Sequence, residues 1–327
     1  MNPLVLKKGM TLTGSIDDYP EGIVIPVDKP YRWTSADVIR KVKWMAIKHF
    51  GKKSLKVGHA GTLDPLATGV LLVCIGKATK LADEFQAHPK EYVAGVSFGA
   101  TTASYDLEKE IDADYPLDGV SEEALRKVLA DMLGEQEQIA PLFSAKSVDG
   151  KRVYEIARQL YKAGKPVEGL DILRANRITL YDLDLLSYCD AAAGASGEGL
   201  ALERPATLGT VRGRGPSASL GGMSCGAANR VEGKALPQGA SSPAGAGKTL
   251  PQGASGRINV ASTEGHRLVR AEIRVACSKG TYIRALARDL GEALGSGAFL
   301  HSLRRTKTGS FRVEEALSIE DITSILI

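Results

Sequence analysis

Residues 191–256 restrict the fold of this 327-residue chain more than any other segment. Gly, Ala, Ser and Pro fill 41 of its 66 positions, and the hexamer LPQGAS occurs in it twice. No Phe, Trp or Tyr occurs between Tyr188 and Tyr282. Such a segment cannot bury enough apolar surface to offset the entropy that ordering it would cost. We therefore predict a low-complexity, flexible insertion at 191–256 within a single domain formed by residues 1–190 and 257–327.

The rest of the chain has the composition of a folded protein. Apolar residues make up 43% of the sequence and charged residues 24%, which is enough to build a core. No apolar run approaches the roughly 20 residues that span a bilayer, and no apolar stretch follows Lys7 and Lys8 as in a secretory signal. The four cysteines show no CxxC spacing and indicate no disulfide framework. We expect a cytoplasmic protein with no membrane segment.

The charges are unevenly distributed, although the formal net charge is only +4. Residues 29–80 hold 11 basic and 2 acidic side chains, and residues 264–312 hold 10 basic and 4 acidic ones. Residues 100–138 hold 3 basic and 11 acidic side chains. The two basic segments would form one basic face if the fold joins them, and otherwise they are two solvated helix faces.

Hydrophobic periodicity predicts a mixed order of strands and helices. Thr34 with Asp37 is a capping-box variant before a helical apolar stripe, and residues 269–277 alternate as in a half-buried strand. The predicted strands are 23–27, 70–75, 92–98, 177–186 and 269–277, and the predicted helices are 34–51, 121–133, 153–161 and 282–294. This order favours an α+β (mixed α/β) fold with a largely antiparallel central sheet flanked by helices. The strands 177–186 and 269–277 flank the insertion, and we expect them to pair as a hairpin.

The stretch from Gly58 to Gly69, GHAGTLDPLATG, is the most unusual of the chain. Its three glycines and one proline indicate a tight loop with a specific path. Asp64 precedes Pro65, which biases its backbone toward an extended conformation. Taken alone, a loop aspartate such as Asp64 or a single histidine such as His59 is more often structural than catalytic.

Together with other motifs of the chain, this stretch resembles the signature of the TruB-type pseudouridine synthases, which isomerise uridine 55 in the T-loop of tRNA. The further motifs occur in the family's order: Asp28-Lys-Pro30 with Thr34-Ser35, Gly76 to Lys80, Lys90-Glu-Tyr92, Gly150 to Tyr154, Ser278 to Arg284, and Leu303-Arg-Arg305 with Gly309-Ser-Phe311. The resemblance implies the pseudouridine synthase fold and places the acidic segment 100–138 away from the tRNA.

The resemblance implies catalytic roles for four residues. Asp64 would be the carboxylate at the ribose, where it either attacks C1′ or takes a proton from the sugar, and both routes stay open. Arg284 would pair with Asp64, since a planar guanidinium orients a carboxylate. Tyr92 would stack on the flipped base. Tyr282 would close the other side of the pocket and is a candidate for handling the C5 proton.

Four further residues are implied in substrate binding. Leu303 would supply an apolar wall, and His59 would enter the T-loop and take the space that the flipped uridine leaves. Lys29 and Lys80 are candidates for phosphate contacts, which position RNA without reading its sequence. The isomerisation needs no cofactor, and we expect no cofactor and no metal. The expected partner is the T-arm of tRNA, bound by a monomer.

The sequence departs from the family's pattern in several places. Tyr31-Arg32-Trp33 stands where the family usually has a small or Gly-containing stretch, which would change RNA contacts near the entry. The chain ends soon after Ile319, so we expect no C-terminal PUA domain. The insertion replaces a short connection, and it is either a neutral expansion, which we favour, or a source of loose RNA contacts through Arg212, Arg214 and Arg230.

Two other functions compete with a stand-alone tRNA pseudouridine-55 synthase. A guide-RNA-dependent synthase subunit usually needs the PUA domain, and its expected absence argues against that class. A non-catalytic RNA-binding or folding-assistant protein is the second alternative. The intact set of Asp64, Tyr92, Tyr282 and Arg284 argues against it.

Overall fold

The computed structural model describes residues 2–141, 143, 147–148, 151–152, 175–190, 258 and 260–327. The predicted helix 153–161 and the predicted insertion 191–256 lie outside the described residues. No helix in the described parts of the chain is long and apolar enough to cross a membrane.

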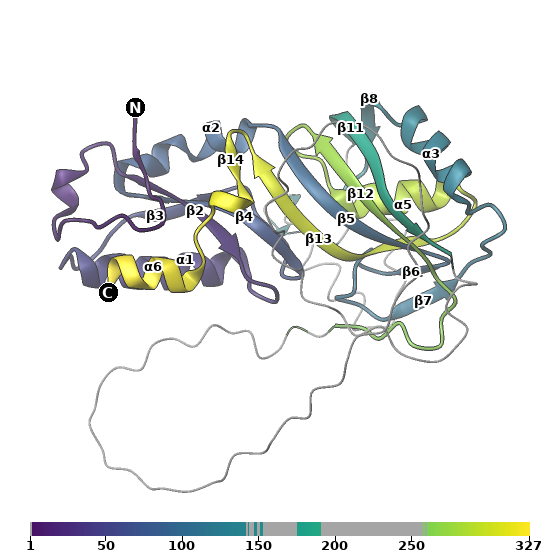
Figure 1. Cartoon of the computed structure of the whole chain (residues 1–327), viewed down its shortest axis with the longest axis horizontal. Coiled ribbons are helices and arrows are strands. Elements are labelled where there is room, and N and C mark those ends of the chain that lie inside the picture. Colours follow the sequence, from purple (N-terminus) through teal and green to yellow (C-terminus); the bar gives the residue numbers. More distant parts are fainter. Residues whose placement is uncertain are drawn as a thin grey trace, which may run out of the picture. The chain divides into compact units, whose positions relative to one another are not determined.

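A ten-stranded sheet forms the framework of the described residues, with the strand order β1-β2-β4-β13-β5-β12-β11-β8 (Figure 1). Strand β14 pairs with β13, and β3 pairs with β4. The strands are β1 (Leu4–Val5), β2 (Ile23–Lys29), β3 (Val57–Ala60), β4 (Ala67–Ile75), β5 (Lys90–Phe98), β8 (Gly134–Gln138), β11 (Asn176–Cys189), β12 (Val269–Cys277), β13 (Ala298–Thr308) and β14 (Phe311–Arg312). Only β1–β2 and β13–β4 pair in parallel within this sheet, so the predicted largely antiparallel, mixed fold is confirmed.

Helices flank this sheet near both of its ends. They are α1 (Ser35–His49), α2 (Ala82–Ala87), α3 (Glu122–Asp131), α5 (Ile283–Ala293) and α6 (Ile319–Leu326). Helices α1 and α6 lie side by side near β2 and β4, and α3 and α5 lie near β11 and β12 (Figure 1). Two short hairpins, β6 (Ala100–Thr102) with β7 (Ile111–Asp114) and β9 (Ser147–Val148) with β10 (Lys151–Arg152), complete the described strands.

Helix α1 begins where the capping pattern predicts it. The Asp37 backbone N–H donates to the Thr34 hydroxyl at 3.0 Å, and the Thr34 N–H donates to the Asp37 carboxylate at 2.9 Å. This reciprocal box satisfies two backbone donors that the first turn would otherwise leave unpaired. The apolar stripe of α1 is then buried through Val38, Val42 and Met45.

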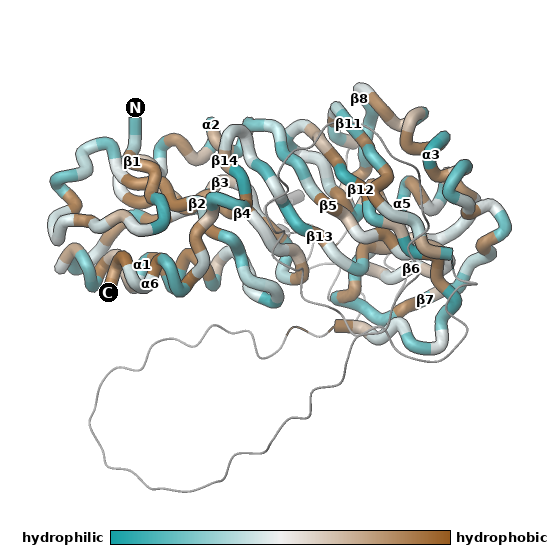
Figure 2. Tube along the Cα trace, in the orientation of Figure 1, coloured by the Kyte–Doolittle hydropathy of each residue, from teal (hydrophilic) through white to brown (hydrophobic). Residues whose placement is uncertain are grey.

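The predicted hairpin between β11 and β12 is present. The two strands pair antiparallel from Leu180 and Cys277 to Cys189 and Arg270. The hydropathy of β12 alternates along the strand, as its trace in Figure 2 shows, and the apolar positions are buried. On the polar face, Arg274 forms ion pairs with Asp182 at 2.9 Å and Asp184 at 3.3 Å, which ties β12 to β11.

Strand β13 lies in the centre of the sheet, although its sequence shows no clear alternation. The register of β13 against β5 shifts twice, between Leu300 and Ser302 and between Arg305 and Lys307. Each shift adds one residue and moves the following side chains to the other face, which breaks the period of two. Because β13 also pairs with β4, the fold brings the two basic segments 29–80 and 264–312 into one sheet.

Two glycines with nearly the same φ allow a test of the contact between β4 and β13. Gly69 has φ +101° and Gly134 has φ +100°, but a Cβ at Gly69 would lie 2.1 Å from the Arg305 carbonyl oxygen, whereas a Cβ at Gly134 would meet nothing within 4 Å. Gly134→Ala should lower the free energy of unfolding by about 1–2 kcal/mol through backbone strain alone. Gly69→Ala should lower it by at least twice that amount, because the strands must also separate. Urea unfolding followed by circular dichroism measures both losses, and equal losses would contradict the close packing.

Candidate active site

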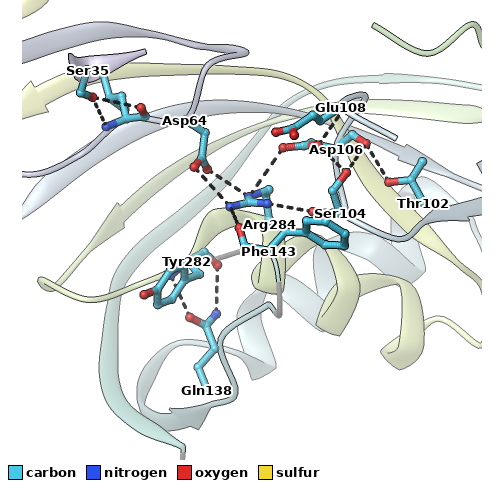
Figure 3. A network of polar contacts seen from close by, with 11 residues as sticks. Ser35, Asp64, Thr102, Ser104, Asp106, Glu108, Gln138, Phe143, Tyr282 and Arg284 are labelled. Carbon is cyan, nitrogen blue, oxygen red and sulfur yellow. Dashed lines mark hydrogen bonds and ion pairs between the residues drawn. The ribbon is translucent and has the colours of Figure 1, made fainter. Parts of the chain in front are cut away.

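Asp64 lies in the loop that joins β3 to β4, and the residue before it is held in place. The Ser35 hydroxyl, in the first turn of α1, donates to the Leu63 carbonyl at 3.1 Å and accepts from the Leu63 N–H at 3.0 Å (Figure 3). The Leu63 side chain is buried in the main core. The start of α1 therefore fixes the backbone position from which the Asp64 side chain extends.

Lys29 holds the same loop from its other side. Its ammonium group donates to the carbonyl oxygens of Pro30 at 2.9 Å, Trp33 at 2.5 Å and Pro65 at 3.2 Å, and the residue is completely buried. The prediction that Lys29 contacts an RNA phosphate is therefore wrong, since the charge points into the protein. Burial lowers the pKa of Lys29 to about 7, although the negative charge of Asp64 opposes the shift.

Arg284 and Asp64, the partners that the sequence predicts, are in contact. Arg284 Nε lies 3.0 Å from Asp64 Oδ2, and Arg284 Nη2 donates to Asp64 Oδ1 at 3.2 Å (Figure 3). The Arg284 side chain is 5% exposed, whereas that of Asp64 is 39% exposed. Burial would lower the pKa of Arg284, but the carboxylates of Asp64 and Asp106 raise it. The guanidinium thus stays charged and presents Asp64 toward solvent in a defined orientation.

Asp106 is a second carboxylate on Arg284, and its oxygen Oδ2 lies 3.6 Å from Arg284 Nε. Its other oxygen accepts from the Ser104 hydroxyl at 2.6 Å and from the Glu108 N–H at 2.9 Å. Burial raises the pKa of Asp106, and the charge of Arg284 opposes that rise. Arg284 also donates to the carbonyl oxygens of Ser104 at 3.1 Å and Phe143 at 2.9 Å.

The position of Asp106 corrects one expectation. The acidic segment 100–138 does not lie entirely away from the site, because Asp106 belongs to it. No local pattern in the sequence distinguishes Asp106 from its acidic neighbours. Its partner Arg284 is far away in the sequence, so only the fold reveals the pair.

A cavity of about 860 Å³ opens beside Asp64. Its lining includes five of the predicted site residues, which are Asp64, Tyr92, Tyr282, Arg284 and Leu303. Tyr92 comes from β5 and Leu303 from the neighbouring strand β13. Tyr282 precedes α5, and the Gln138 side chain holds its backbone through bonds of 2.9 and 3.2 Å to its N–H and carbonyl (Figure 3).

Arg305 is a buried cation in the wall of this cavity, 1% exposed. Its Nε donates to the Val70 carbonyl at 2.7 Å, and its Nη2 donates to the Gly61 carbonyl at 3.2 Å. Arg305 thus connects β13 to β4 and to the start of the Asp64 loop. Burial raises the pKa of the neighbouring Tyr92, and the charge of Arg305 opposes the rise.

His59 and Lys80 occupy different surroundings. His59 lies on β3, half-buried, and its Nδ1 has no hydrogen-bond partner among the described residues. Burial lowers the pKa of His59, and the charge of Arg305 adds to that effect. Lys80 is exposed on the short helical turn Gly76–Leu81, where its charge faces solvent. The RNA contacts of both residues stay predictions.

Two family models match this chain. The model described as TruB family pseudouridylate synthase (N terminal domain) covers residues 48–195, and the tRNA pseudouridylate synthase B C-terminal domain covers residues 284–327. The tRNA pseudouridine synthase B of Phocaeicola vulgatus is 39% identical over 303 residues, 93% of this chain and 92% of that protein. The protein of the same name from Flavobacterium johnsoniae is 34% identical, over 93% of this chain and 95% of that protein. The chain belongs to the TruB family of pseudouridylate synthases.

Membership of the TruB family confirms the resemblance that the ordered motifs predict. A chain in the crystal structure of a Cbf5-Nop10-Gar1 complex has the same fold, with a TM-score of 0.50 and 22% sequence identity. The match covers 99% of this chain and 64% of that one, so this chain spans less than two thirds of its length. The residues matched by the C-terminal family model include β13, α6 and nearly all of α5. Strand β13 lies between β4 and β5, which belong to the residues matched by the N-terminal family model, so both matches contribute to one sheet.

The buried ammonium of Lys29 predicts a pH-dependent stability. An unfolded lysine has a pKa of about 10.5, whereas folding lowers the pKa of Lys29 to about 7. Between these values the unfolded chain binds more protons, so this group makes the free energy of unfolding rise with pH. The difference in this free energy between wild type and Lys29→Met should therefore grow from pH 7 to pH 9 in urea unfolding. Lys43→Met, on the exposed side of α1, controls for loss of a charge, and a difference that shrinks with pH would refute the prediction.

Asp106→Asn tests the second carboxylate on Arg284. The amide keeps the shape of the side chain but removes the charge that helps to hold the guanidinium. Pseudouridine formation should slow by about tenfold or more, because the buried guanidinium loses one of its two carboxylate partners. Single-turnover kinetics with saturating enzyme measures the step directly. Asp112→Asn, on the same hairpin but exposed, is the matched control, and equal rates for both variants would remove Asp106 from the mechanism.

Proposed function

We propose that this protein isomerises uridine 55 in the T-loop of tRNA to pseudouridine, as a stand-alone enzyme that flips the base out of its stack. Its TruB relatives are named tRNA pseudouridine synthase B, which supports tRNA as the substrate. The observation that carries the proposal is the Asp64 carboxylate, partly exposed at a large cavity and held from behind by the buried Arg284.

The reaction breaks the bond between ribose C1′ and uracil N1 and forms a bond between C1′ and C5. The proton at C5 is lost and N1 gains one, so atoms balance without a co-reactant. Asp64 acts at the sugar, either by attack on C1′ or by removal of a sugar proton. Both routes need a carboxylate with one fixed orientation, and the two contacts with Arg284 provide it.

The cavity walls suit a flipped uracil. Extrusion of the base costs a few kcal/mol of stacking, which contacts in the pocket must offset. Tyr92 offers a ring for stacking, and Leu303, two strand positions from it across the β5–β13 pairing, offers an apolar surface. Tyr282 closes the other side and handles the C5 proton, with its backbone fixed by Gln138.

The RNA outside the cavity is held mainly by its backbone and shape. The exposed Lys80 contacts a phosphate of the T-arm, and His59 takes the space of the flipped uridine. We also propose that the enzyme works as a monomer in the cytoplasm. Residues 191–256, which lie outside the described residues, form a low-complexity insertion in the catalytic domain and play no part in the chemistry.

Asp64→Asn tests the proposed function. The substrate is an unmodified tRNA transcript with tritium at uracil C5, and release of tritium to water reports the isomerisation. Wild type should release label without any added RNA, and Asp64→Asn should be slower by at least about a hundredfold, because a catalytic carboxylate has been removed. Asp131→Asn, exposed on α3, is the control for a lost charge.

Three outcomes separate the alternatives. Absence of release by wild type, or equal release by Asp64→Asn, would rule out an Asp64-dependent synthase and favour a non-catalytic RNA-binding protein. Release that needs an added guide RNA would contradict the stand-alone function. Release at a uridine other than position 55, mapped after the reaction, would correct the substrate site alone.

A further inference from the structure

The turn after β2 departs from the family's pattern and lies beside the catalytic loop. It consists of Pro30 to Trp33, and the Arg32 N–H donates to the Pro65 carbonyl at 2.9 Å. The buried Lys29 ammonium bonds to both ends of the turn and to the same Pro65 carbonyl. The turn is therefore fixed one residue away from Asp64.

Arg32 has an unusual backbone conformation, with φ +63°. This left-handed region favours glycine. A bulky residue held there costs conformational energy, and such residues cluster at functional sites. The Arg32 guanidinium donates to the Ile258 carbonyl. A few residues on, the Ala261 N–H donates to the Leu107 carbonyl at 2.8 Å, next to Asp106. Hydrogen bonds thus link the turn to Ile258, and Ala261 to the segment that contains Asp106.

Tyr31 is the exposed residue of this turn, with 43% of its surface accessible. Partial burial raises the pKa of Tyr31, the charge of Arg32 opposes the rise, and the negative charge of Asp106 adds to it. The adjacent Arg32 is hydrogen-bonded to Pro65, so Tyr31 lies beside the catalytic loop. An accessible aromatic ring at this place, on a turn that the catalytic loop holds rigid, is suited to stacking on an unpaired base.

We propose that Tyr31 is a further substrate-contacting residue, which stacks on a base of the RNA next to the uridine that enters the cavity. The proposal rests on the proposed function, since it needs an RNA with splayed bases at this site. Stacking on an aromatic ring tolerates any base, so Tyr31 adds affinity without adding sequence specificity. Arg32 serves this contact indirectly, because it fixes the turn from which Tyr31 projects.

Tyr31→Ala tests the contact in the full-length protein. The dissociation constant for an unmodified tRNA transcript should rise about tenfold or more, the usual effect of losing one stacked base. Tyr31→Phe keeps the ring and should restore most of the lost affinity. Tyr115→Ala is the matched control, because Tyr115 is equally exposed, at 42%. It lies against Gly297, which follows the C-terminal end of α5, whereas the active-site residue Arg284 lies in the first turn of that helix.

The outcomes are distinguishable from those of the proposed function. Binding is measured separately from tritium release, so the contact is decided even if wild type shows no turnover. Unchanged affinity of Tyr31→Ala would overturn the proposal, as would an equal loss in Tyr115→Ala. Tyr31→Ala could also lose affinity together with a lower melting temperature, without restoration by Tyr31→Phe. That result would show a structural role for Tyr31 and would also overturn the proposal.

Discussion

The buried guanidinium of Arg284 is the interaction on which the active site depends. A cation taken out of water is costly unless carboxylates and hydrogen-bond acceptors surround it. Here Asp64, Asp106 and the carbonyl oxygens of Ser104 and Phe143 do so. These partners come from segments far apart in the sequence. The need to satisfy one charge therefore brings the catalytic loop, the segment after β6 and the start of α5 together.

Three other buried cations serve the same kind of purpose. Lys29 and Arg305 donate to backbone carbonyls on both sides of the Asp64 loop. Lys90, whose pKa burial lowers to about 8, donates to the carbonyls of Gln86 and His88 at the end of α2. Basic residues in the family's motifs thus divide into two groups. Some fix loops from inside the protein, and others, such as Lys80, present their charge to solvent.

Elements with strong local signals were predictable, and elements that depend on the sheet were not. The capping box of Thr34 and Asp37 and the alternation of β12 are local, and the structure contains both elements. Strand β13 carries two register shifts, which remove the alternation that marks a strand. Likewise, His59 belongs to a strand although its neighbours are glycine-rich, because pairing with β4 overrides the local preference.

The sequence by itself determined the family, the order of the motifs and the candidate residues around Asp64, because these depend on residue types and spacing along the chain. The tertiary structure alone decided which charges are buried. Lys29 and Lys80 look equivalent in the sequence, yet one is enclosed by three carbonyl groups and the other faces solvent. It also decided that Asp106 belongs to the site. Burial and long-range pairing are properties of the folded chain, and they set whether a lysine or an aspartate supports the loop, holds a partner or meets the substrate.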